Sequence, residues 1–329
     1  MNYKSVVVTQ RGGLESLKIV ENELRAPAAG EVRVKILASP VCQDDVAVRV
    51  GNRPFLPKPP FTPGYSILGL VESLGEGVSG FSVGERVAAL TTFGGHAEYI
   101  YLPAEKLVAV PAGLDPAEAV TLILNYLVAY QTMHRVAKVK AGDTILLIGA
   151  SGGVGTALLQ LGKLAGLKMY GLASPSKHPL LAEYGAIPID YRSQDFVAVL
   201  RQAEPAGLDF VFNGMGEETF ERGLAVLRKG GVLIHYGGPQ SLSRMLLLIV
   251  KVIGYNLTGR KIEGYGTSRL GVELFKQDWN TSFEMLGQGQ IKPIIAAKFP
   301  LLEAARGYEL LESGAVSGNI VLIASELMK

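Results

Sequence analysis

The chain has 329 residues, of which 48% are hydrophobic, and its 32 basic against 30 acidic residues leave a net charge of +2. This length exceeds the roughly 100–200 residues of one typical domain, so we expect two domains. The balanced charge excludes the clustered surplus of Lys and Arg that nucleic-acid binding needs, and a small neutral or anionic ligand fits better. The single cysteine, Cys42, cannot form an internal disulfide, which favours a reducing, cytoplasmic compartment.

Neither a secretory signal nor a membrane span is expected. The opening MNYKSVVVTQRGG lacks the apolar region and the cleavage site of a secretory signal. The most apolar stretch, MLLLIVKVIGY from Met245, contains Lys251 and is much shorter than the roughly 20 residues that span a bilayer. We expect this stretch to form a buried helix or a subunit contact.

Residues 1–110 have the pattern of an all-β domain. Gly and Pro separate short runs rich in β-branched residues, and no helical period is sustained across them. These runs include EVRVKILAS, GLVESLG and AEYIYLPA. The segment VGERVAAL has the pattern of a turn that leads into a strand of a small barrel.

A change of pattern at Asp115 marks a domain boundary. Asp115 can cap a helix, Pro116 suits its first position, and apolar residues follow at helical spacing as far as residue 139. Near the C-terminus, GNIVLIA has the pattern of a strand that needs a sheet to join. We therefore assign residues 1–121 and 258–329 to one domain and residues 122–257 to another.

Strands and helices alternate within the second domain. The segments with a strand pattern are DTILLIGA (143–150), KMYGLAS, IPIDY, LDFVFNG and GVLIHYGG. The helical segments that separate them are VGTALLQLGKLAG, SKHPLLAEYG, FVAVLRQAE and EETFERGLAVLRKGG. Repeated βα units require right-handed crossovers and a parallel sheet, so the sequence predicts a doubly wound α/β domain.

The strongest motif is the glycine-rich loop in LLIGASGGVGTALLQ, between a predicted strand and a predicted helix. Backbone N–H groups and a helix N-terminus can hold a pyrophosphate there, and glycines allow its close approach. The strict G-x-G-x-x-G spacing is absent, and a turn made only for packing is the alternative. The βαβ context favours a dinucleotide site. Its predicted contacts are Ala150, Ser151, Gly152, Gly153, Val154 and Gly155.

The end of the following strand predicts which nicotinamide cofactor binds. NAD requires a carboxylate there for the ribose 2′-hydroxyl, but GLASPSKHP is followed by no carboxylate before Glu183. Ser174 and Lys177 instead offer a hydroxyl and a cation for a 2′-phosphate, so we expect NADPH. Tyr191 and Arg192 can flank the same phosphate, although Lys177 and Arg192 can also be solvated surface charges.

Potential zinc ligands are too few. A catalytic zinc needs three protein ligands, and a structural zinc needs four, commonly cysteines. With Cys42 and four scattered histidines, neither set has a recognisable spacing, so we expect no metal.

Several segments together resemble one family. In chain order they are SPVCQDDVAVRVG, PFTPGYSILGLVESLGEGVSGFSVGERVAAL, GGHAEYIYLPAEKLVAVP, NYLVAYQTM, GDTILLIGASGGVG and SGAVSGNIVLIA. They are similar to the medium-chain dehydrogenase/reductase superfamily, and to its zinc-free quinone reductase branch. The resemblance covers nearly the whole chain. It implies a GroES-like β-barrel catalytic domain, a Rossmann domain, an active site in the cleft between them, and NADPH as the hydride donor.

The resemblance also implies which residues contact the cofactor. Those that match contacts to the 2′-phosphate are Ser174, Lys177 and Tyr191. Those expected at strand ends toward the nicotinamide, or near the cofactor in the returning strand, are Asn213, Tyr236, Gly237, Gly238 and Asn319.

Candidates for catalysis follow from departures from the family pattern. Tyr65 stands where zinc members have a histidine ligand, and Cys42 where they have their first ligand. Tyr65 can donate a hydrogen bond to a carbonyl oxygen that becomes negative during hydride addition, or can pack with its hydroxyl satisfied locally. Asn125 and Tyr126 are competing donors, although Asn125 can also cap a helix. Cys42 can line the site or be a small buried residue.

These features predict an NADPH-dependent, zinc-independent reductase that transfers hydride to a quinone or an α,β-unsaturated carbonyl. An enoyl-thioester reductase and a non-catalytic nucleotide-binding protein on the same scaffold are the alternatives, because a fold does not decide function. We also expect a homodimer, with SRMLLLIVKVIGYNLTGRKI contributing to its contact.

Overall fold

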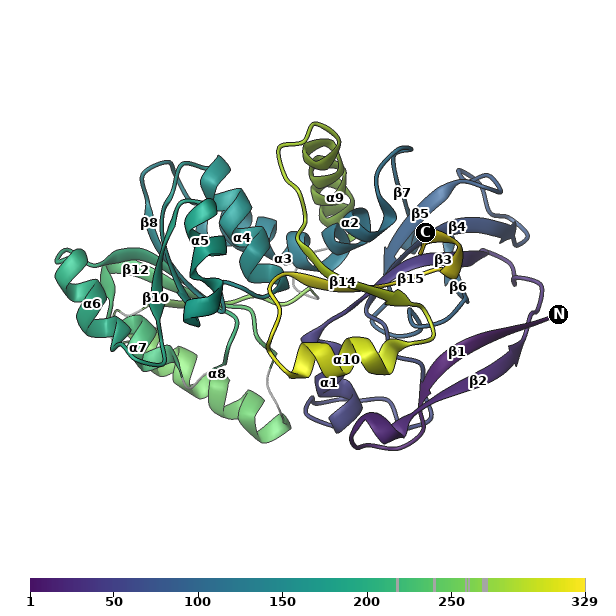
Figure 1. Ribbon diagram of the computed structural model, residues 1–329, viewed down its shortest axis with the longest axis horizontal. Coiled ribbons are helices and arrows are strands. Elements are labelled where there is room, and N and C mark those ends of the chain that lie inside the picture. Colours follow the sequence, from purple (N-terminus) through teal and green to yellow (C-terminus); the bar gives the residue numbers. More distant parts are fainter. Residues whose placement is uncertain (217–218, 239–240, 258, 260, 268–271, 329) are drawn as a thin grey trace. The chain divides into compact units, whose positions relative to one another are not determined.

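The computed structural model describes residues 1–216, 219–238, 241–257, 259, 261–267 and 272–328 (Figure 1). The chain forms two compact units. Unit 1 comprises Met1–Leu124 and Val272–Lys329, and unit 2 comprises Asn125–Gly271. The boundaries that the sequence predicts, after residues 121 and 257, stay a proposal.

Unit 1 is built on a mixed sheet with the strand order β14-β15-β3-β4-β5-β7, in which β6 also pairs with β3. These strands are β3 (Glu31–Val41), β4 (Ser66–Leu74), β5 (Arg86–Leu90), β6 (Tyr99–Pro103), β7 (Val108–Ala109), β14 (Ile295–Pro300) and β15 (Asn319–Ile323). A separate antiparallel pair consists of β1 (Asn2–Val8) and β2 (Leu17–Glu23). The α-helices of unit 1 are α1 (Gln43–Val50), α2 (Pro116–Thr121), α9 (Val272–Gly287) and α10 (Ala304–Glu312).

Strand β15 joins the C-terminal part of the chain to the sheet of unit 1. It pairs antiparallel with β3, where Ile320 lies opposite Val41, and parallel with β14. All of its residues are buried. The prediction that GNIVLIA returns to the first domain is therefore confirmed.

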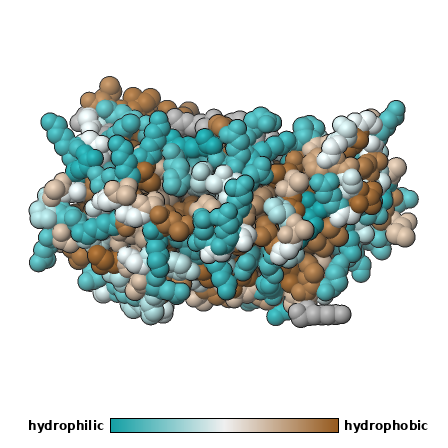
Figure 2. All heavy atoms as spheres, turned by 90° about the horizontal axis from the view of Figure 1, so that it is seen from above, coloured by the Kyte–Doolittle hydropathy of each residue, from teal (hydrophilic) through white to brown (hydrophobic). Residues whose placement is uncertain are grey.

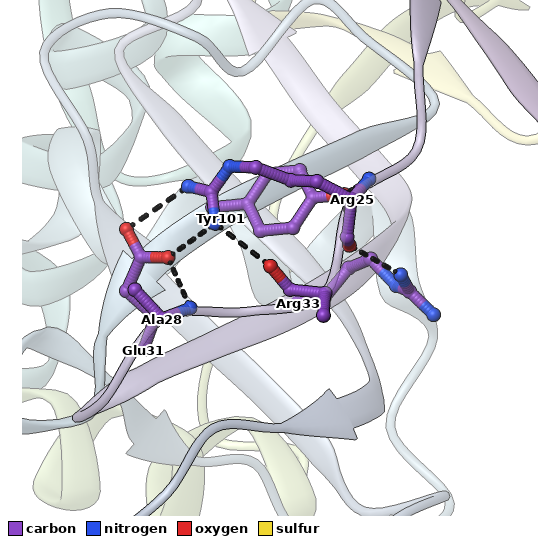
Figure 3. Close-up of polar contacts among 6 residues, drawn as sticks. Arg25, Ala28, Glu31, Arg33 and Tyr101 are labelled. Atoms are coloured by element: carbon purple, nitrogen blue, oxygen red, sulfur yellow. Dashed lines mark hydrogen bonds and ion pairs between the residues drawn. The ribbon is translucent and has the colours of Figure 1, made fainter.

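The segment between β2 and β3 is fastened by Arg25 (Figure 3). The guanidinium of Arg25 lies 4.1 Å from the centre of the Tyr101 ring and donates to both carboxylate oxygens of Glu31, at 2.7 and 3.1 Å. Arg33 donates to the carbonyl oxygen of Arg25 at 2.7 Å. These contacts fix the start of β3, the strand whose other end leads directly to Cys42.

The prediction that residues 1–110 contain no helix is wrong at α1. Cys42 is its N-cap, and the carboxylate of Asp45 accepts a hydrogen bond from the Cys42 backbone N–H at 2.9 Å. Gly51 ends the helix in the left-handed region, at φ 91°. The helix has eight residues, too few to show a helical period in the sequence.

The helix predicted to begin at Asp115 is capped as expected but is not a continuous α-helix. Asp115 Oδ1 accepts the backbone N–H groups of Ala117 and Glu118 at 2.9 and 3.0 Å. After α2, π-helical segments at Leu122–Tyr126 and Gln131–Ala137 flank α3 (Leu127–Tyr130). Such segments are rare and often occur at functional sites, and here the first contains two of the predicted catalytic residues.

Unit 2 contains the five predicted strands in a parallel sheet, with a sixth strand, β13, that the sequence analysis did not predict; the order is β10-β9-β8-β11-β12-β13. Its strands are β8 (Thr144–Ile148), β9 (Lys168–Ala173), β10 (Ala186–Asp190), β11 (Leu208–Asn213), β12 (Leu227–His235) and β13 (Lys261–Gly264). Its other α-helices are α4 (Gly153–Leu164), α5 (His178–Glu183), α6 (Phe196–Ala203), α7 (Phe220–Leu224) and α8 (Leu242–Leu257). One predicted boundary is wrong: the helix in EETFERGLAVLRKGG ends at Leu224, and β12 begins at Leu227.

Helices cover both faces of this sheet. Along β9, Tyr170 and Leu172 pack in a core with residues of α6 and α7. Gly171 points to the other face, where an added Cβ would lie 2.6 Å from the side chain of Leu181 in α5. Because side chains of a strand alternate between faces, the two sets of helices lie on opposite sides.

Helix α8 is more exposed than the sequence predicts. Leu248, Val252 and Tyr255 pack against the core of unit 2, but no residue of the helix is buried. The expectation of a buried helix is therefore wrong, and the subunit contact stays a prediction. No helix in the described part of the chain is long and apolar enough to cross a membrane. On the face seen in Figure 2, hydrophobic residues are interspersed with many hydrophilic ones.

Candidate functional site

The glycine-rich loop joins β8 to α4, as predicted. Gly149 follows β8 at φ 86°, Gly152 is the N-cap of α4 with an extended backbone, and the helix begins at Gly153. A Cβ on Gly155 would lie 2.2 Å from the carbonyl oxygen of Gly149. Only glycine therefore lets the first turn of α4 pack so closely against the end of β8. Gly152 is exposed, so the amides that begin α4 can meet an anion.

The remaining predicted loop residues differ in exposure. Ser151 and Val154 are half-buried, whereas the side chain of Ala150 is fully buried beside Gly171. Ala150 can therefore contact a ligand only through its backbone.

The residues predicted for the 2′-phosphate come from two neighbouring strand ends. Ser174 follows β9 and caps the short 3₁₀ helix Pro175–Lys177, where the Lys177 N–H donates to the Ser174 carbonyl at 2.9 Å. Tyr191 follows β10, is 49% exposed, and has the guanidinium of Arg192 5.8 Å from its ring centre. Since β9 and β10 are paired in parallel, these side chains lie at the same edge of the sheet.

Asn213 shapes the loop after β11. Its Oδ1 accepts the backbone N–H of Met215 at 2.9 Å, and its Nδ2 donates to the Gly216 carbonyl at 2.8 Å. Tyr236, which follows β12, lies against Gly214, where an added Cβ would be 2.6 Å from the ring. The predicted residues Gly237 and Gly238 continue this chain segment. The direct contact of these residues with a nicotinamide stays a prediction.

Asn319 is placed in unit 1, at the start of β15. It is buried, and its Nδ2 donates to the Ile294 carbonyl at 3.0 Å. The observed role of this side chain is to hold the segment before β14, and its predicted position near the cofactor is a separate proposal.

Asn125 and Tyr126 lie in the first π-helical segment. The alternative that Asn125 caps a helix is wrong, because it lies inside this helical run. The Tyr126 side chain is buried, and its hydroxyl donates to Gln160 Oε1 at 2.9 Å. Gln160 belongs to α4 and in turn donates to the Tyr184 hydroxyl at 3.3 Å. Tyr126 therefore connects the π-helical segment to the helix that follows the glycine-rich loop.

Cys42 and the turn before Tyr65 are held by one carboxylate, that of Asp45. Its Oδ2 accepts the Cys42 backbone N–H at 2.9 Å and lies 3.0 Å from the thiol, and its Oδ1 accepts the Gly64 N–H at 3.0 Å. Asp45 is 2% exposed, and its burial raises the pKa of its carboxyl group. Burial and the nearby Asp45 raise the pKa of the Cys42 thiol, which is therefore un-ionised.

Sequence reasoning missed Asp45 because it missed helix α1. The signal that could have found it is the spacing between Cys42 and Asp45, which is that of a capping box.

Tyr65 is half-buried, and its backbone carbonyl accepts the N–H groups of Thr91 and Thr92 at 2.9 and 3.1 Å. Gly64 has φ 111°, and an added Cβ would lie 2.4 Å from the backbone nitrogen of His96. The segments 62–65 and 91–96 thus pack backbone to backbone, which fixes where the Tyr65 side chain leaves the chain.

His96 lies in the core of unit 1. Its Nε2 is 3.2 Å from the Pro40 carbonyl, its Nδ1 is 3.2 Å from the Tyr308 hydroxyl, and burial lowers its pKa. Arg49, also buried, forms an ion pair with Glu312 at 2.7 Å. Across the residues that the structure describes, no three His, Cys, Asp or Glu side chains form a group that could hold a metal ion. The expectation of a metal-free protein awaits elemental analysis.

Comparisons with known proteins agree with this architecture. Residues 28–112 match the family model of the alcohol dehydrogenase GroES-like domain, and residues 185–322 match that of zinc-binding dehydrogenases. The synaptic vesicle membrane protein VAT-1 homolog of Danio rerio is 29% identical over 99% of this chain and 71% of its own length. The quinone oxidoreductase of Rattus norvegicus is 28% identical over 97% of both chains.

A solved structure adds the three-dimensional match. Escherichia coli quinone oxidoreductase complexed with NADPH superposes with a TM-score of 0.87 and 26% identity, covering 97% of this chain and 99% of that one. The chain belongs to the medium-chain dehydrogenase/reductase superfamily, in its quinone oxidoreductase branch. The predicted fold class, a GroES-like domain with a Rossmann domain, is confirmed.

Proposed function

We propose that this member of the superfamily is an NADPH-dependent oxidoreductase that transfers hydride to a quinone or to an α,β-unsaturated carbonyl compound, an enone or alkenal. The observation that carries the proposal is the glycine-rich loop at the start of α4, with Ser174 and Lys177 at the end of the next strand. The names of the rat and bacterial relatives, one of them bound to NADPH, support it.

The residues of unit 2 fit the cofactor. The exposed Gly152 and the amides at the start of α4 would hold the pyrophosphate, because the positive end of the helix dipole favours an anion. Lys177 would meet the 2′-phosphate, with Ser174 and Tyr191 beside it. When bound, NADPH supplies the hydride, and the protein supplies position and polarisation.

Tyr65 is the proposed donor to the substrate. A carbonyl oxygen becomes negative as hydride adds to the conjugated carbon, and a phenol O–H can stabilise that charge through a hydrogen bond. The backbone bonds between Tyr65 and segment 91–96 hold its main chain in place. Cys42, whose thiol is un-ionised, contributes a small side chain rather than a nucleophile.

The proposal is tested by mixing purified protein with NADPH and a panel of quinones, enones and enoyl thioesters while following absorbance of the reduced nicotinamide. Oxidation with quinones or enones supports it. Oxidation with enoyl thioesters alone selects the enoyl-thioester alternative. Tight NADPH binding without turnover of any substrate selects the non-catalytic alternative.

We also propose that the chain forms a homodimer through α8. Leu246, Val250, Ile253 and Leu257 recur at helical spacing and are 57%, 65%, 55% and 83% exposed. An apolar stripe of this kind is costly to leave in water. Strand β13 lies beyond α8 in the chain and at the edge of the described sheet, where a second copy could extend the pairing.

A further inference from the structure

His96 joins the two chain segments that carry the predicted catalytic residues of unit 1. Its ring Nε2 lies 3.2 Å from the carbonyl oxygen of Pro40, two residues before Cys42. Its backbone N–H donates to the carbonyl oxygen of Pro63 at 2.9 Å, two residues before Tyr65. His96 is fully buried, so both contacts lie in the core of unit 1. The position of this residue therefore affects the backbone on both sides of the predicted site.

Tyr308 holds the other side of the His96 ring. Its hydroxyl lies 3.2 Å from Nδ1, and the two rings meet edge to face with their centres 5.7 Å apart. Tyr308 belongs to α10 and is fully buried. The same helix packs against the end of β3, since a Cβ on Gly307 would lie 3.0 Å from the side chain of Val41. The C-terminal part of the chain thus supports the segment before Cys42 in two places.

The two partners of the ring require one tautomer of neutral His96. A carbonyl oxygen only accepts hydrogen bonds, so Nε2 carries the proton and donates to Pro40. Nδ1 then has a lone pair and accepts the hydroxyl of Tyr308. A second proton, on Nδ1, would meet the hydroxyl hydrogen, and Tyr308 would have to turn its O–H away inside the core. The arrangement therefore lasts only while His96 is neutral.

Ionisable groups act on the His96 ring from two helices. On α1, the carboxylate of Asp45 favours a second proton on the ring, but burial opposes it more strongly and lowers the pKa of His96. On α10, burial raises the pKa of Tyr308, so its hydroxyl keeps its proton. Beyond Tyr308, the guanidinium of Arg49 lies 5.6 Å from the centre of that ring and is paired with Glu312. At neutral pH the His96 ring is therefore uncharged and keeps both contacts.

We propose that His96 and Tyr308 are positioning residues for hydride transfer, which hold the backbone of Cys42 and Tyr65 in its active arrangement only while His96 is neutral. The inference rests on the proposed function, because it concerns the same site. Neither residue has to contact the substrate. Protonation of His96 would break the bond from Tyr308 and force the two rings to repack, so kcat should fall in mild acid.

The first experiment measures kcat with a quinone or enone, and the Kd for NADPH by calorimetric titration. His96→Phe removes both ring contacts and should lower kcat about tenfold at pH 7.5 without changing the Kd. His96→Gln carries a donor and an acceptor on one amide and should restore most of the activity. If the ring merely filled space, phenylalanine would be the better replacement. Should His96→Phe fail to fold, the milder change Tyr308→Phe carries the test.

The pH profile of kcat separates positioning from general stability. In the unmodified protein kcat should fall in acid with a midpoint below about 6.5, the ordinary pKa of histidine. Tyr308→Phe removes only the hydroxyl, which makes protonation of Nδ1 easier, so the midpoint should rise by about half a pH unit or more. His96→Gln does not titrate there, and its kcat should stay nearly constant between pH 8 and pH 5.5. Tyr170→Phe removes the bond from another buried tyrosine, to Glu204 in unit 2, and as the matched control should keep the unmodified profile.

Nuclear magnetic resonance of the protein with nitrogen-15-labelled histidine reports the tautomer of His96 without any turnover. A proton on Nε2 at pH 7.5 supports the inference, and a proton on Nδ1 would overturn it. So would an acid limb that persists in His96→Gln, an unshifted midpoint in Tyr308→Phe, or a kcat of the unmodified protein that does not change down to pH 5.5. If the unmodified protein reduces no quinone or enone at all, the proposed function fails instead.

Discussion

At the scale of single residues, Tyr65 is the candidate whose hydroxyl should affect the rate of the chemical step without affecting the binding of NADPH. Tyr65→Phe removes a hydroxyl and keeps the ring. We expect kcat for enone reduction to fall at least about tenfold, because a hydrogen bond that strengthens in the transition state is lost. The Kd for NADPH should stay unchanged. Steady-state kinetics measures kcat, and calorimetric titration measures the Kd for NADPH. An unaltered kcat, with chemistry shown to limit the rate, would make Tyr65 a packing residue.

Asp45 is a positioning residue, since it holds both Cys42 and the turn before Tyr65 without being exposed itself. In Asp45→Asn, an NH₂ group replaces one of the two carboxylate oxygens. It then faces a backbone N–H group that donated a hydrogen bond to that oxygen. We expect the free energy of unfolding to fall by about 2 kcal/mol and kcat to fall with it, while the Kd for NADPH is preserved.

The matched control for Asp45→Asn is Ser39→Ala. It removes another buried hydrogen bond of unit 1, from the Ser39 hydroxyl to the Ser66 carbonyl at 2.9 Å. It should lower stability by about 1 kcal/mol without changing kcat. Equal loss of kcat in both variants would show that Asp45 acts only through general stability.

At the scale of secondary-structure elements, the glycine-rich loop depends on how closely α4 approaches β8. Gly155→Ala would place a methyl group 2.2 Å from the Gly149 carbonyl oxygen, so the start of α4 must shift. We expect more than about tenfold weaker NADPH binding and a loss of about 1–3 kcal/mol in the free energy of unfolding.

Gly254→Ala is the control for this substitution. Gly254 lies inside α8, and an added Cβ would meet nothing within 4 Å. Alanine favours helix at such a site, so this variant should be as stable as the unmodified protein or more stable, with the same Kd for NADPH. Calorimetric titration measures the Kd for NADPH of both variants, and urea unfolding measures their stability. If Gly155→Ala binds NADPH as tightly as the unmodified protein does, the expectation is wrong.

The elements that the sequence predicted well are those with local signals. Asp115 caps α2 because its side chain accepts two N–H groups of the first turn, and β8 is a nearly continuous apolar run. Helix α1 was missed because its ends are made by Cys42, Asp45 and Gly51 rather than by periodic apolar residues. The π-helical segments share the hydrophobic pattern of an α-helix, so sequence does not distinguish them.

Prediction of the site shows the same division. The glycine-rich loop and Ser174 with Lys177 follow strands directly, and the order of elements was enough to place them. Asp45 is indicated locally only by its capping-box spacing from Cys42, whereas its bond to Gly64 joins residues distant in sequence, so no local pattern could indicate that contact.

At the scale of the whole molecule, the proposed dimer can be tested by breaking the apolar stripe of α8. Ile253→Glu places a charge in that stripe, and we expect light scattering to report a monomer at micromolar concentration where the unmodified protein is a dimer. Ile19→Glu changes an equally exposed isoleucine in β2 and should leave the dimer intact. An unmodified protein that is already monomeric would refute the proposal.

Stability of the molecule should decrease in mild acid because of His96. Burial holds the pKa of this histidine below its ordinary value of about 6.5, so the unfolded chain binds a proton there that the native protein excludes. The free energy of unfolding should therefore fall as pH falls below about 6.5, by at most about 1.4 kcal/mol per pH unit from this group.

Urea unfolding of the unmodified protein and of His96→Gln between pH 7 and pH 5 measures that contribution. The variant is expected to be less stable at pH 7 and to lose less stability on acidification. Asp45 acts on stability in the opposite direction, because its raised pKa lets the native protein bind a proton at a higher pH than the unfolded chain does. Identical pH slopes in the two proteins would show that another group is responsible.

The pairing of β15 with β3 affects the order in which the two units can fold. Unit 2 is one continuous segment, whereas unit 1 pairs β3 with a strand near the other end of the chain. Domains fold as units during synthesis, and contacts between residues far apart in sequence form slowly. On the ribosome, unit 2 can therefore fold while the sheet of unit 1 still lacks its last strands. Strand β3, which leads to Cys42, would then reach its native surroundings only after β15 has been synthesised.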